Sequence, residues 1–403
     1  MKEVLVLFSL LVLFSGCERK TPGQVLEQWL RKEPAARQEM TGQKFATVPL
    51  SKEEAAQVEE LLWQDYQGIV KAESQKVWEE KCLKHRSLSL RFDYKVFGEE
   101  PEDGRSLYIS MHGGGNTATS VNDQQWNNQI RLYQPREGVY IAPRAPWDDW
   151  NMWFKPGIDS LFDELIQTAV AVMGVNPDKV YLMGYSAGGD GVYRLAPRMA
   201  DRWAAAAMMA GHPGEVSMLN LRNTPFTLWM GELDAAYDRN RMAVERGLEL
   251  DSLHRADPGG YIHETHIVRG KGHWMERQDS VAVEWMAQYR RNPLPDRIVW
   301  RQENVVHPSF YWLAVPEDEC VPGAMVVVER QGNQFDIKTC DYKKLTIRLN
   351  DKLADLDQPV SVTYQGKVLY QEKTERTIRT LYRTLGERGD KGLFFCSEIT
   401  VNL

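Results

Sequence analysis

The stretch VYLMGYSAGGDGVYRLAPRM, residues 180–199, decides the fold. An apolar run ends at Gly184, and Gly184 to Gly188 fit the pattern G-x-S-x-G around Ser186. A strand, a tight turn that carries a serine and then a helix form the context in which this pattern exposes a nucleophilic hydroxyl. We expect crowding to require both glycines, and a helix beginning at Ala187 to direct its free N–H groups at the site. The alternative is a serine in a turn whose glycines only permit packing.

On both sides of this stretch, short β-rich runs alternate with amphipathic helical segments. The runs within residues 87–290 are SLSLRFDYKVF, SLYISMH, VYIAPRA, KVYLMGY, AAAAMMAG, FTLWMG and HETHIVRG. Between two of them, apolar residues from Ile158 to Val170 recur at i, i+3, i+4 and i+7, the spacing of a helix with one buried face. Such alternation is typical of a largely parallel sheet covered by helices, so we predict an α/β fold.

The segment before this region has a helical pattern. Residues 24–40 and 52–82 carry apolar side chains at helical spacing, and Ser51 with Glu54 forms a capping box. We therefore expect residues 17–86 to form a helical segment that lies against the main domain.

The segment after this region has a β pattern. Two prolines in NPLPD, residues 292–296, end the main domain, which we place at 87–292. Short strand-like runs separated by turn residues fill 297–403, with one helical interruption at 375–388. This pattern predicts a small β-sandwich-like domain at the C-terminus.

A serine hydroxyl needs a base, and the base needs a carboxylate that orients it. Asp234 follows the strand FTLWMG, and His273 lies in a glycine-flanked loop after the strand HETHIVRG. The order Ser, Asp, His along the chain suits a sheet of this type. We therefore predict Ser186, Asp234 and His273 as nucleophile, acid and base, with Glu232 and Asp238 as rivals for the acid.

A second glycine-rich turn, HGGG at residues 112–115, follows the strand SLYIS. Successive glycines let bare backbone N–H groups approach an oxygen that develops negative charge. We predict that Gly114 and Gly115 supply such donors together with the N–H of Ala187. Which of the glycine amides faces the oxygen stays open, and the alternative is a turn that is merely tight.

With these motifs, residues 87–290 resemble the α/β-hydrolase superfamily, and within it secreted esterases similar to polyhydroxybutyrate depolymerases, feruloyl and acetylxylan esterases and predicted peptidases. The resemblance implies an α/β-hydrolase fold and a serine hydrolase that cleaves a carboxylic ester through a Ser-His-Asp acyl-enzyme, without a cofactor. Carbohydrate-linked acyl groups are among the expected substrates. A serine peptidase and a surface lipoprotein that binds without catalysis are the alternatives. GGDG at 188–191 departs from the usual G-x-S-x-G-G-x-M pattern, which bears on the substrate class.

Several residues are candidates for the substrate cleft. Trp147, Trp150 and Trp153 in PWDDWNMWF follow the strand VYIAPRA, where they form either an aromatic wall of the cleft or a plug that packs the loop. Asp190 either caps the nucleophile helix or contacts a polar substrate. His212 either lines the cleft or belongs to a turn.

The N-terminus has the pattern of an export signal. In MKEVLVLFSLLVLFSGC the apolar run is shorter than the ~20 residues of a membrane-spanning helix, so residues 1–16 are predicted to be a signal peptide. Gly16-Cys17 resembles a bacterial lipobox. We therefore expect an exported chain anchored to a bacterial membrane through a lipid on Cys17, facing the periplasm or the cell surface. Ordinary secretion with a free cysteine is the alternative.

Composition limits the partners. The formal net charge of -7 gives no indication of nucleic-acid binding. Cys82, Cys320, Cys340 and Cys396 allow three disulfide pairings, and the sequence does not choose among them. No His or Cys spacing indicates a metal site. The expected partners are an ester substrate, small or polymeric, and the membrane, with the oligomeric state open.

Overall fold

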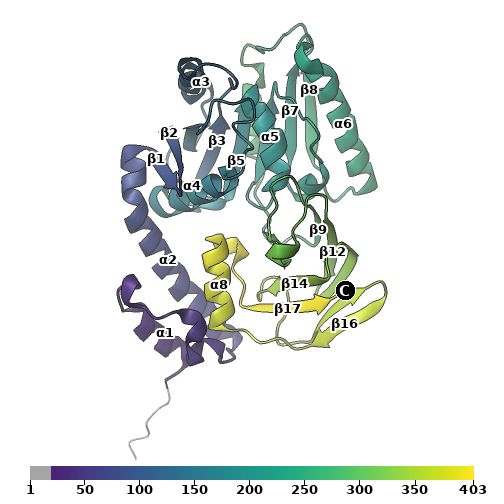
Figure 1. The fold of residues 1–403 in the computed structure, drawn as a ribbon. Helices are drawn as coiled ribbons and strands as arrows, with labels where there is room; N and C mark the ends of the chain where they lie inside the picture. The colour runs from purple at the N-terminus through teal and green to yellow at the C-terminus, as the bar shows by residue number, and fades with distance from the viewer. Residues whose placement is uncertain (1–19) are drawn as a thin grey trace, which may run out of the picture.

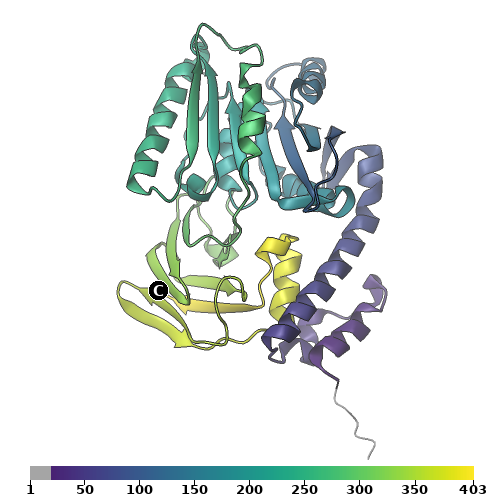
Figure 2. The same ribbon diagram turned by 180° about the vertical axis from the view of Figure 1, so that it is seen from behind.

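The computed structural model describes residues 20–403. The predicted signal peptide, residues 1–16, and Cys17 lie outside the described residues. Figure 1 shows an α/β domain, a smaller β domain beneath it, and a long helix, α2, that runs along one side of both. The view from behind in Figure 2 shows the same arrangement.

An eight-stranded sheet forms the centre of the α/β domain, in the order β1-β2-β4-β3-β5-β6-β7-β8. The strands are β1 (Cys82–His85), β2 (Leu88–Phe97), β3 (Arg105–Met111), β4 (Gly138–Arg144), β5 (Val175–Tyr185), β6 (Ala205–Met209), β7 (Phe226–Gly231) and β8 (His263–Val268). β2 is antiparallel to both of its neighbours, whereas β3 to β8 run parallel. The carboxyl ends of the parallel strands therefore share one edge, where loops from distant parts of the chain meet.

Helices cover both faces of this sheet. Along β3, Leu107 and Ile109 enter one hydrophobic layer and Tyr108 enters the other. The first layer includes α4 (Ile158–Met173), α5 (Ala187–Arg198) and α6 (Arg239–Ala256), and the second includes α7 (Val281–Met286) and the end of α3 (Thr119–Leu132). Burial on both faces explains why the strands read as continuous apolar runs. The predicted α/β class with a mostly parallel sheet is confirmed.

Two helices precede the sheet, α1 (Pro22–Leu30) and α2 (Lys52–Glu80). α2 begins at the predicted capping box, in which the Ser51 hydroxyl accepts from the N–H of Glu54 and the Glu54 carboxylate accepts from the N–H of Ser51. The expected helix over 24–40 is wrong beyond Leu30, because only short 3₁₀ turns follow there. Pro34 lacks the N–H that a continuing helix would use.

α2 packs on both domains, not on the main domain alone. Its first half places Ala55, Val58 and Leu62 in the core of the β domain. Its last turns lie against α4, and Trp78 belongs to the core of the α/β domain. The helical segment therefore connects the two bodies, as Figure 1 shows.

The C-terminal domain is built from two sheets with one shared core, in the orders β10-β11-β14-β17 and β16-β15-β13-β12-β9. The strands are β9 (Arg297–Arg301), β10 (Ser309–Phe310), β11 (Leu313–Ala314), β12 (Met325–Gln331), β13 (Gln334–Cys340), β14 (Lys344–Leu349), β15 (Val360–Tyr364), β16 (Lys367–Glu372) and β17 (Ser397–Asn402). One helix, α8 (Ile378–Arg388), lies within the predicted interruption at 375–388 and packs into the same core. The domain is β-sandwich-like, as predicted.

A buried network of ion pairs joins the two domains. Asp390 is 3% exposed and accepts hydrogen bonds from Arg291 at 2.5 and 3.0 Å and from Arg202 at 3.1 Å. Burial opposes ionisation of this carboxyl, but the two guanidinium groups outweigh it and hold the pKa of Asp390 well below its ordinary value. Arg388 likewise pairs with Asp201 at 2.5 Å. Because an unpaired member would be a buried charge, the network favours one orientation of the domains.

The four cysteines of the described region are free thiols, so none of the three disulfide pairings is formed. Burial raises the pKa of Cys396 to about 12, which makes it an unreactive core residue. Among residues 20–403, no helix combines the length and the apolar composition needed to cross a membrane.

Candidate active site

Ser186 lies in the turn between β5 and α5, with φ 58° and ψ −120°, a conformation that L residues rarely adopt. A Cβ at Gly184 would lie 2.3 Å from the carbonyl oxygen of Gly188, and a Cβ at Gly188 would lie 2.1 Å from that of Met111. Both neighbours are main-chain atoms that have no room to move aside. The close approach of strand and helix at this turn therefore requires both glycines and holds the hydroxyl at the carboxyl edge of the sheet.

Ser186, His273 and Asp234 form one hydrogen-bonded chain. His273 Nε2 lies 2.9 Å from Ser186 Oγ, and His273 Nδ1 lies 2.7 Å from Asp234 Oδ2. Ser186 follows β5, Asp234 follows β7 and His273 follows β8. The three residues therefore lie in loops that meet at the shared edge of the sheet. The side chain of Asp234 is 2% exposed and that of His273 is 44% exposed. A buried carboxylate on Nδ1 favours the tautomer in which Nε2 accepts the serine proton.

The two rival acids of the same loop do not reach His273. The carboxylate of Glu232 accepts from the N–H of Gly270 at 2.7 Å, so it ties down the loop that carries the histidine. Asp238 is exposed and pairs with Arg241 at 3.1 Å. The structure thus brings only Asp234, of the three carboxylates in this loop, to the imidazole.

Of the two glycines predicted as donors in the HGGG turn, only Gly114 keeps its N–H available among the described residues. Gly114 and Ala187 line the same cavity as Ser186, and we find no protein acceptor for either N–H within residues 20–403. The N–H of Gly115, by contrast, donates to Asn122 Oδ1 at 2.8 Å. Its predicted place among the oxyanion donors is therefore wrong, because the amide is already committed to a side chain.

His112 supports this turn from below, a role that the sequence analysis did not assign. It is fully buried; its Nδ1 lies 2.6 Å from the carbonyl oxygen of Gly113, and its Nε2 accepts from the N–H of Ala145 at 3.2 Å. Burial lowers the pKa of His112 to about 4, so the ring is neutral near pH 7. A neutral ring that donates through one nitrogen and accepts through the other fits both contacts.

The GGDG stretch after Ser186 is explained by close packing on two sides of α5 and by the cavity that Asp190 borders. A Cβ at Gly189 would lie 2.4 Å from the carbonyl oxygen of Met209, and one at Gly191 would lie 2.5 Å from Cβ of Trp153. Between them, Asp190 accepts from the N–H of His212 at 2.6 Å. Its carboxyl holds the loop after β6 against the nucleophile helix and borders the cavity at the same time.

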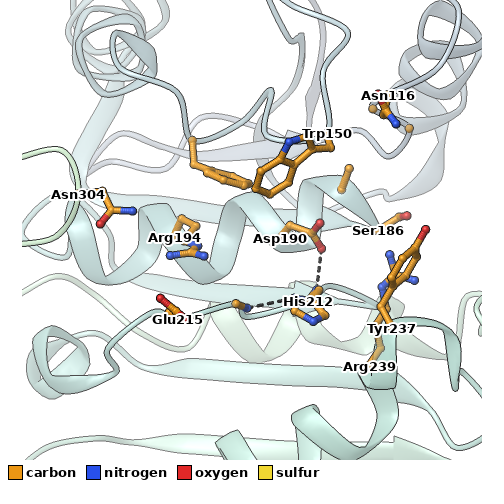
Figure 3. Close-up of a pocket in the computed structure, with 15 residues that line it drawn as sticks. Asn116, Trp150, Ser186, Asp190, Arg194, His212, Glu215, Tyr237, Arg239 and Asn304 are labelled. Atoms are coloured by element: carbon orange, nitrogen blue, oxygen red, sulfur yellow. Dashed lines mark hydrogen bonds between the residues drawn. The ribbon is translucent and has the colours of Figure 1, made fainter.

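A cavity of about 580 Å³ opens beside Ser186. Figure 3 shows Trp150 above it and Asp190 and His212 on its floor, so these three predicted cleft residues lie where they were expected. Burial raises the pKa of Asp190 to about 6, and its bond from His212 and the charge of Arg239 offset only part of this effect. Near pH 7 the carboxyl is therefore mostly ionised.

The other two tryptophans of the aromatic loop do not line the cavity. Trp153 is fully buried, donates through Nε1 to the carbonyl oxygen of His112 at 2.8 Å and lies against Gly191. Trp147 is partly buried against the core, and the ammonium group of Lys155 lies over its ring, 5.1 Å from the ring centre. The predicted wall is thus limited to Trp150, which is 62% exposed, and Phe154, whereas Trp147 and Trp153 pack the loop onto the domain.

A second cavity, of about 530 Å³, lies on the His273 side of Ser186. Its lining includes the apolar residues Val121, Leu132 and Trp274 and the amide residues Gln125, Asn128 and Gln129. Ser186 and Gly114 border both cavities, so the Ser186 hydroxyl lies between two spaces of different character.

The sequence analysis missed several residues of the first cavity, among them Arg194, Tyr237, Arg239 and Asn304. The first could have been found, because Ser186, Asp190 and Arg194 follow one another at i, i+4 and i+8 along a single helix face. Asn304 could not, because it belongs to the loop after β9 in the other domain. Within residues 20–403, no cluster of His, Cys, Asp and Glu is arranged to hold a metal ion.

No family model and no curated protein matches the chain. Among solved structures the chain is similar to a thermostable esterase, with 17% identity and a TM-score of 0.42. The match covers 53% of this chain and 64% of the esterase chain, so this chain spans less than two thirds of the esterase's length. It is also similar to a ferulic acid esterase (17% identity, TM-score 0.35, 51% and 95% coverage). A poly(3-hydroxybutyrate) depolymerase from Bordetella parapertussis gives 17% identity, a TM-score of 0.36, and 50% and 85% coverage.

At these identities and TM-scores the likeness carries no argument about this chain. The chain's own topology is more specific: a mostly parallel eight-stranded sheet, a serine in the turn between β5 and α5, and an acid and a histidine after β7 and β8. The chain therefore has the fold of the α/β-hydrolase superfamily, as its motifs predicted.

Proposed function

We propose that the protein is a serine hydrolase that cleaves carboxylic esters through an acyl-enzyme. The observation that carries the proposal is the continuous hydrogen-bonded chain from Ser186 Oγ through His273 to the buried Asp234, at 2.9 and 2.7 Å. In this geometry His273 Nε2 takes the hydroxyl proton while Oγ attacks the ester carbonyl carbon. Asp234 stabilises the imidazolium that results.

The remaining steps use groups that border the same cavities as Ser186. The N–H groups of Gly114 and Ala187 stabilise the oxyanion of the tetrahedral intermediate. His273 then returns its proton to the leaving alcohol, and a water molecule attacks the acyl-enzyme by the same route. Each of these steps needs only proton transfer and hydrogen bonding.

The two cavities receive the two halves of the ester. The leaving oxygen has to lie near His273 Nε2, so the alcohol occupies the cavity that His273 borders. The half-exposed Trp274 and the amides of Gln125 and Asn128 suit a sugar alcohol, which they can stack on and hydrogen-bond. The acyl group then occupies the cavity beside Asp190.

A fluorophosphonate probe tests the reaction class, because it labels only an activated serine. We expect labelling of the wild type and none of Ser186→Ala, together with hydrolysis of p-nitrophenyl esters by the wild type. No labelling of the wild type would refute the proposal. A panel of acetylated xylan, feruloylated sugars and aminoacyl anilides then separates esterase from peptidase, and faster cleavage of the anilides would contradict the ester assignment.

We further propose, from the sequence of the N-terminus, that the chain is exported and carries a lipid on Cys17. Expression in a bacterium with labelled palmitate tests this point. We expect label in the membrane fraction for the wild type and a soluble, unlabelled product for Cys17→Ser. Equal labelling of both would contradict the anchor.

A further inference from the structure

Two arginines, Arg194 and Arg239, border the cavity beside Asp190, which we call the acyl cavity. We find no ion pair and no hydrogen bond to the guanidinium of Arg194 or Arg239 within residues 20–403, and Nε of Arg239 is buried. One turn further along α5, Arg198 forms an ion pair with the buried Asp159 at 2.5 Å. Arg194, which faces the cavity, has no such partner among residues 20–403. Two free guanidinium groups in a cavity beside the nucleophile are suited to bind an anion.

Aromatic rings and glycine hold the two guanidinium groups in place. Cζ of Arg194 lies 5.4 Å from the ring centre of Phe154, and that of Arg239 lies 5.0 Å from the ring centre of Tyr237. Such stacking orients a guanidinium and leaves its N–H donors available. Arg194 also lies against Gly214, where a Cβ would be only 2.2 Å from its Nη2.

The nearby carboxylates do not neutralise these charges by direct contact. Asp190 is committed to the N–H of His212. Glu303, whose charge acts on Arg194, lies 3.4 Å from Arg301. Glu215 is exposed at the cavity. The guanidinium of Arg194 therefore keeps its hydrogen-bonding capacity for a ligand.

The position of Arg194 sets a length for that ligand. Figure 3 shows Ser186, Asp190 and Arg194 in line along α5, with Asn304 beyond Arg194 at the far end of the cavity. Eight residues of helix correspond to roughly 12 Å. An extended chain advances ~3.5 Å for every three bonds, so roughly ten bonds connect the scissile carbonyl to Arg194.

We propose that the acyl group of the substrate ends in a carboxylate that binds Arg194, with the amide of Asn304 as a second donor. This inference rests on the proposed ester hydrolysis and adds the chemical class of the acyl group. Arg239 lies closer to the nucleophile and contributes positive potential along the path. Asp190, between the two ends, is placed to accept a hydrogen bond from a hydroxyl group on the chain.

Matched esters test the proposal. The substrates are mono-p-nitrophenyl esters of linear dicarboxylic acids with 4 to 12 carbons, each beside the same ester with its free carboxylate methylated. We expect kcat/KM to favour the free carboxylate by about ten- to hundredfold at chain lengths near ten carbons, the factor of one charge-assisted hydrogen bond. Arg194→Gln abolishes this preference mainly through KM, whereas Arg241→Gln, at an exposed arginine paired with Asp238 and Glu245, retains it.

Three results would overturn the proposal: no preference for the carboxylate at any length, a preference that survives Arg194→Gln, or a preference that peaks at four to six carbons and is lost only in Arg239→Gln.

A binding measurement covers the case of slow turnover. Calorimetry with Ser186→Ala and a free ten-carbon dicarboxylate should show binding that weakens with salt and with Arg194→Gln, and no binding refutes the inference. Fluorophosphonate labelling without carboxylate preference refutes the inference alone, whereas absence of labelling refutes the proposed function.

Discussion

The acid of the triad offers the sharpest test of the site, because one loop carries three carboxylates and only that of Asp234 contacts His273. Asp234→Asn replaces the acceptor 2.7 Å from His273 Nδ1 with an amide, and the site is 2% exposed, so water has no room to substitute. An amide N–H facing Nδ1 forces the proton onto Nε2, which then donates to Ser186 and cannot act as a base. We expect kcat for p-nitrophenyl acetate at pH 8 to fall about 10⁴-fold, equivalent to ~5 kcal/mol of transition-state stabilisation.

Two variants of the same loop serve as controls. Glu232→Gln keeps a side-chain oxygen for the N–H of Gly270, and Asp238→Asn affects only an exposed ion pair, so both should retain kcat within about threefold. Circular dichroism and the free energy of unfolding should show that all three variants fold. A loss of less than tenfold in Asp234→Asn, or an equal loss in either control, would refute the assignment of Asp234.

Three further predictions concern stability, measured by urea unfolding. Asp390→Asn removes the buried carboxylate that Arg291 and Arg202 share and leaves them only the partly exposed Asp178 and Asp163, so it should lower the free energy of unfolding by about 3 kcal/mol; an unchanged value would contradict the network. Gly191→Ala should destabilise the protein, because overpacking against Trp153 costs about 1–3 kcal/mol and exceeds the ~1 kcal/mol gained in helix propensity, whereas Gly386→Ala, with no atom within 4 Å, should stabilise it. Asp190 binds its proton more tightly in the folded protein, with a pKa raised from 3.8 to about 6, so the stabilisation by the protonated carboxyl is present below pH 4 and is lost as pH rises through 6. The free energy of unfolding of Asp190→Asn should therefore rise relative to wild type by roughly 3 kcal/mol between pH 4 and pH 7. A difference between the two proteins that does not change with pH would contradict the shift.

The turn around Ser186 was predictable because its residues form one short contiguous pattern between a strand and a helix. Glycine at 184 and 188 is required by main-chain atoms a few ångströms away, and the sequence shows both glycines within five residues. The order of acid and histidine follows from the order of the strands. The sheet itself was predictable because its strands are buried on both faces and read as apolar runs.

Other features depend on contacts that the sequence does not show. Trp150 and Trp153 are three residues apart in one loop, yet one is 62% exposed and the other fully buried. The amide of Gly115 is unavailable because Asn122, from the following helix, reaches back to it. The apolar stripe of α2 indicated burial but not that its two halves would pack on different domains.

Asn304 reaches the cavity from the β domain, whereas the triad and the amides of Gly114 and Ala187 belong entirely to the α/β domain. Under the proposed function, bond cleavage and the far end of substrate recognition are thus encoded in separate stretches of the gene. Recombination that replaces the loop between β9 and β10 would alter which acyl groups are accepted while leaving the reaction intact. This loop is accordingly the natural place to begin when redirecting the protein to a new substrate.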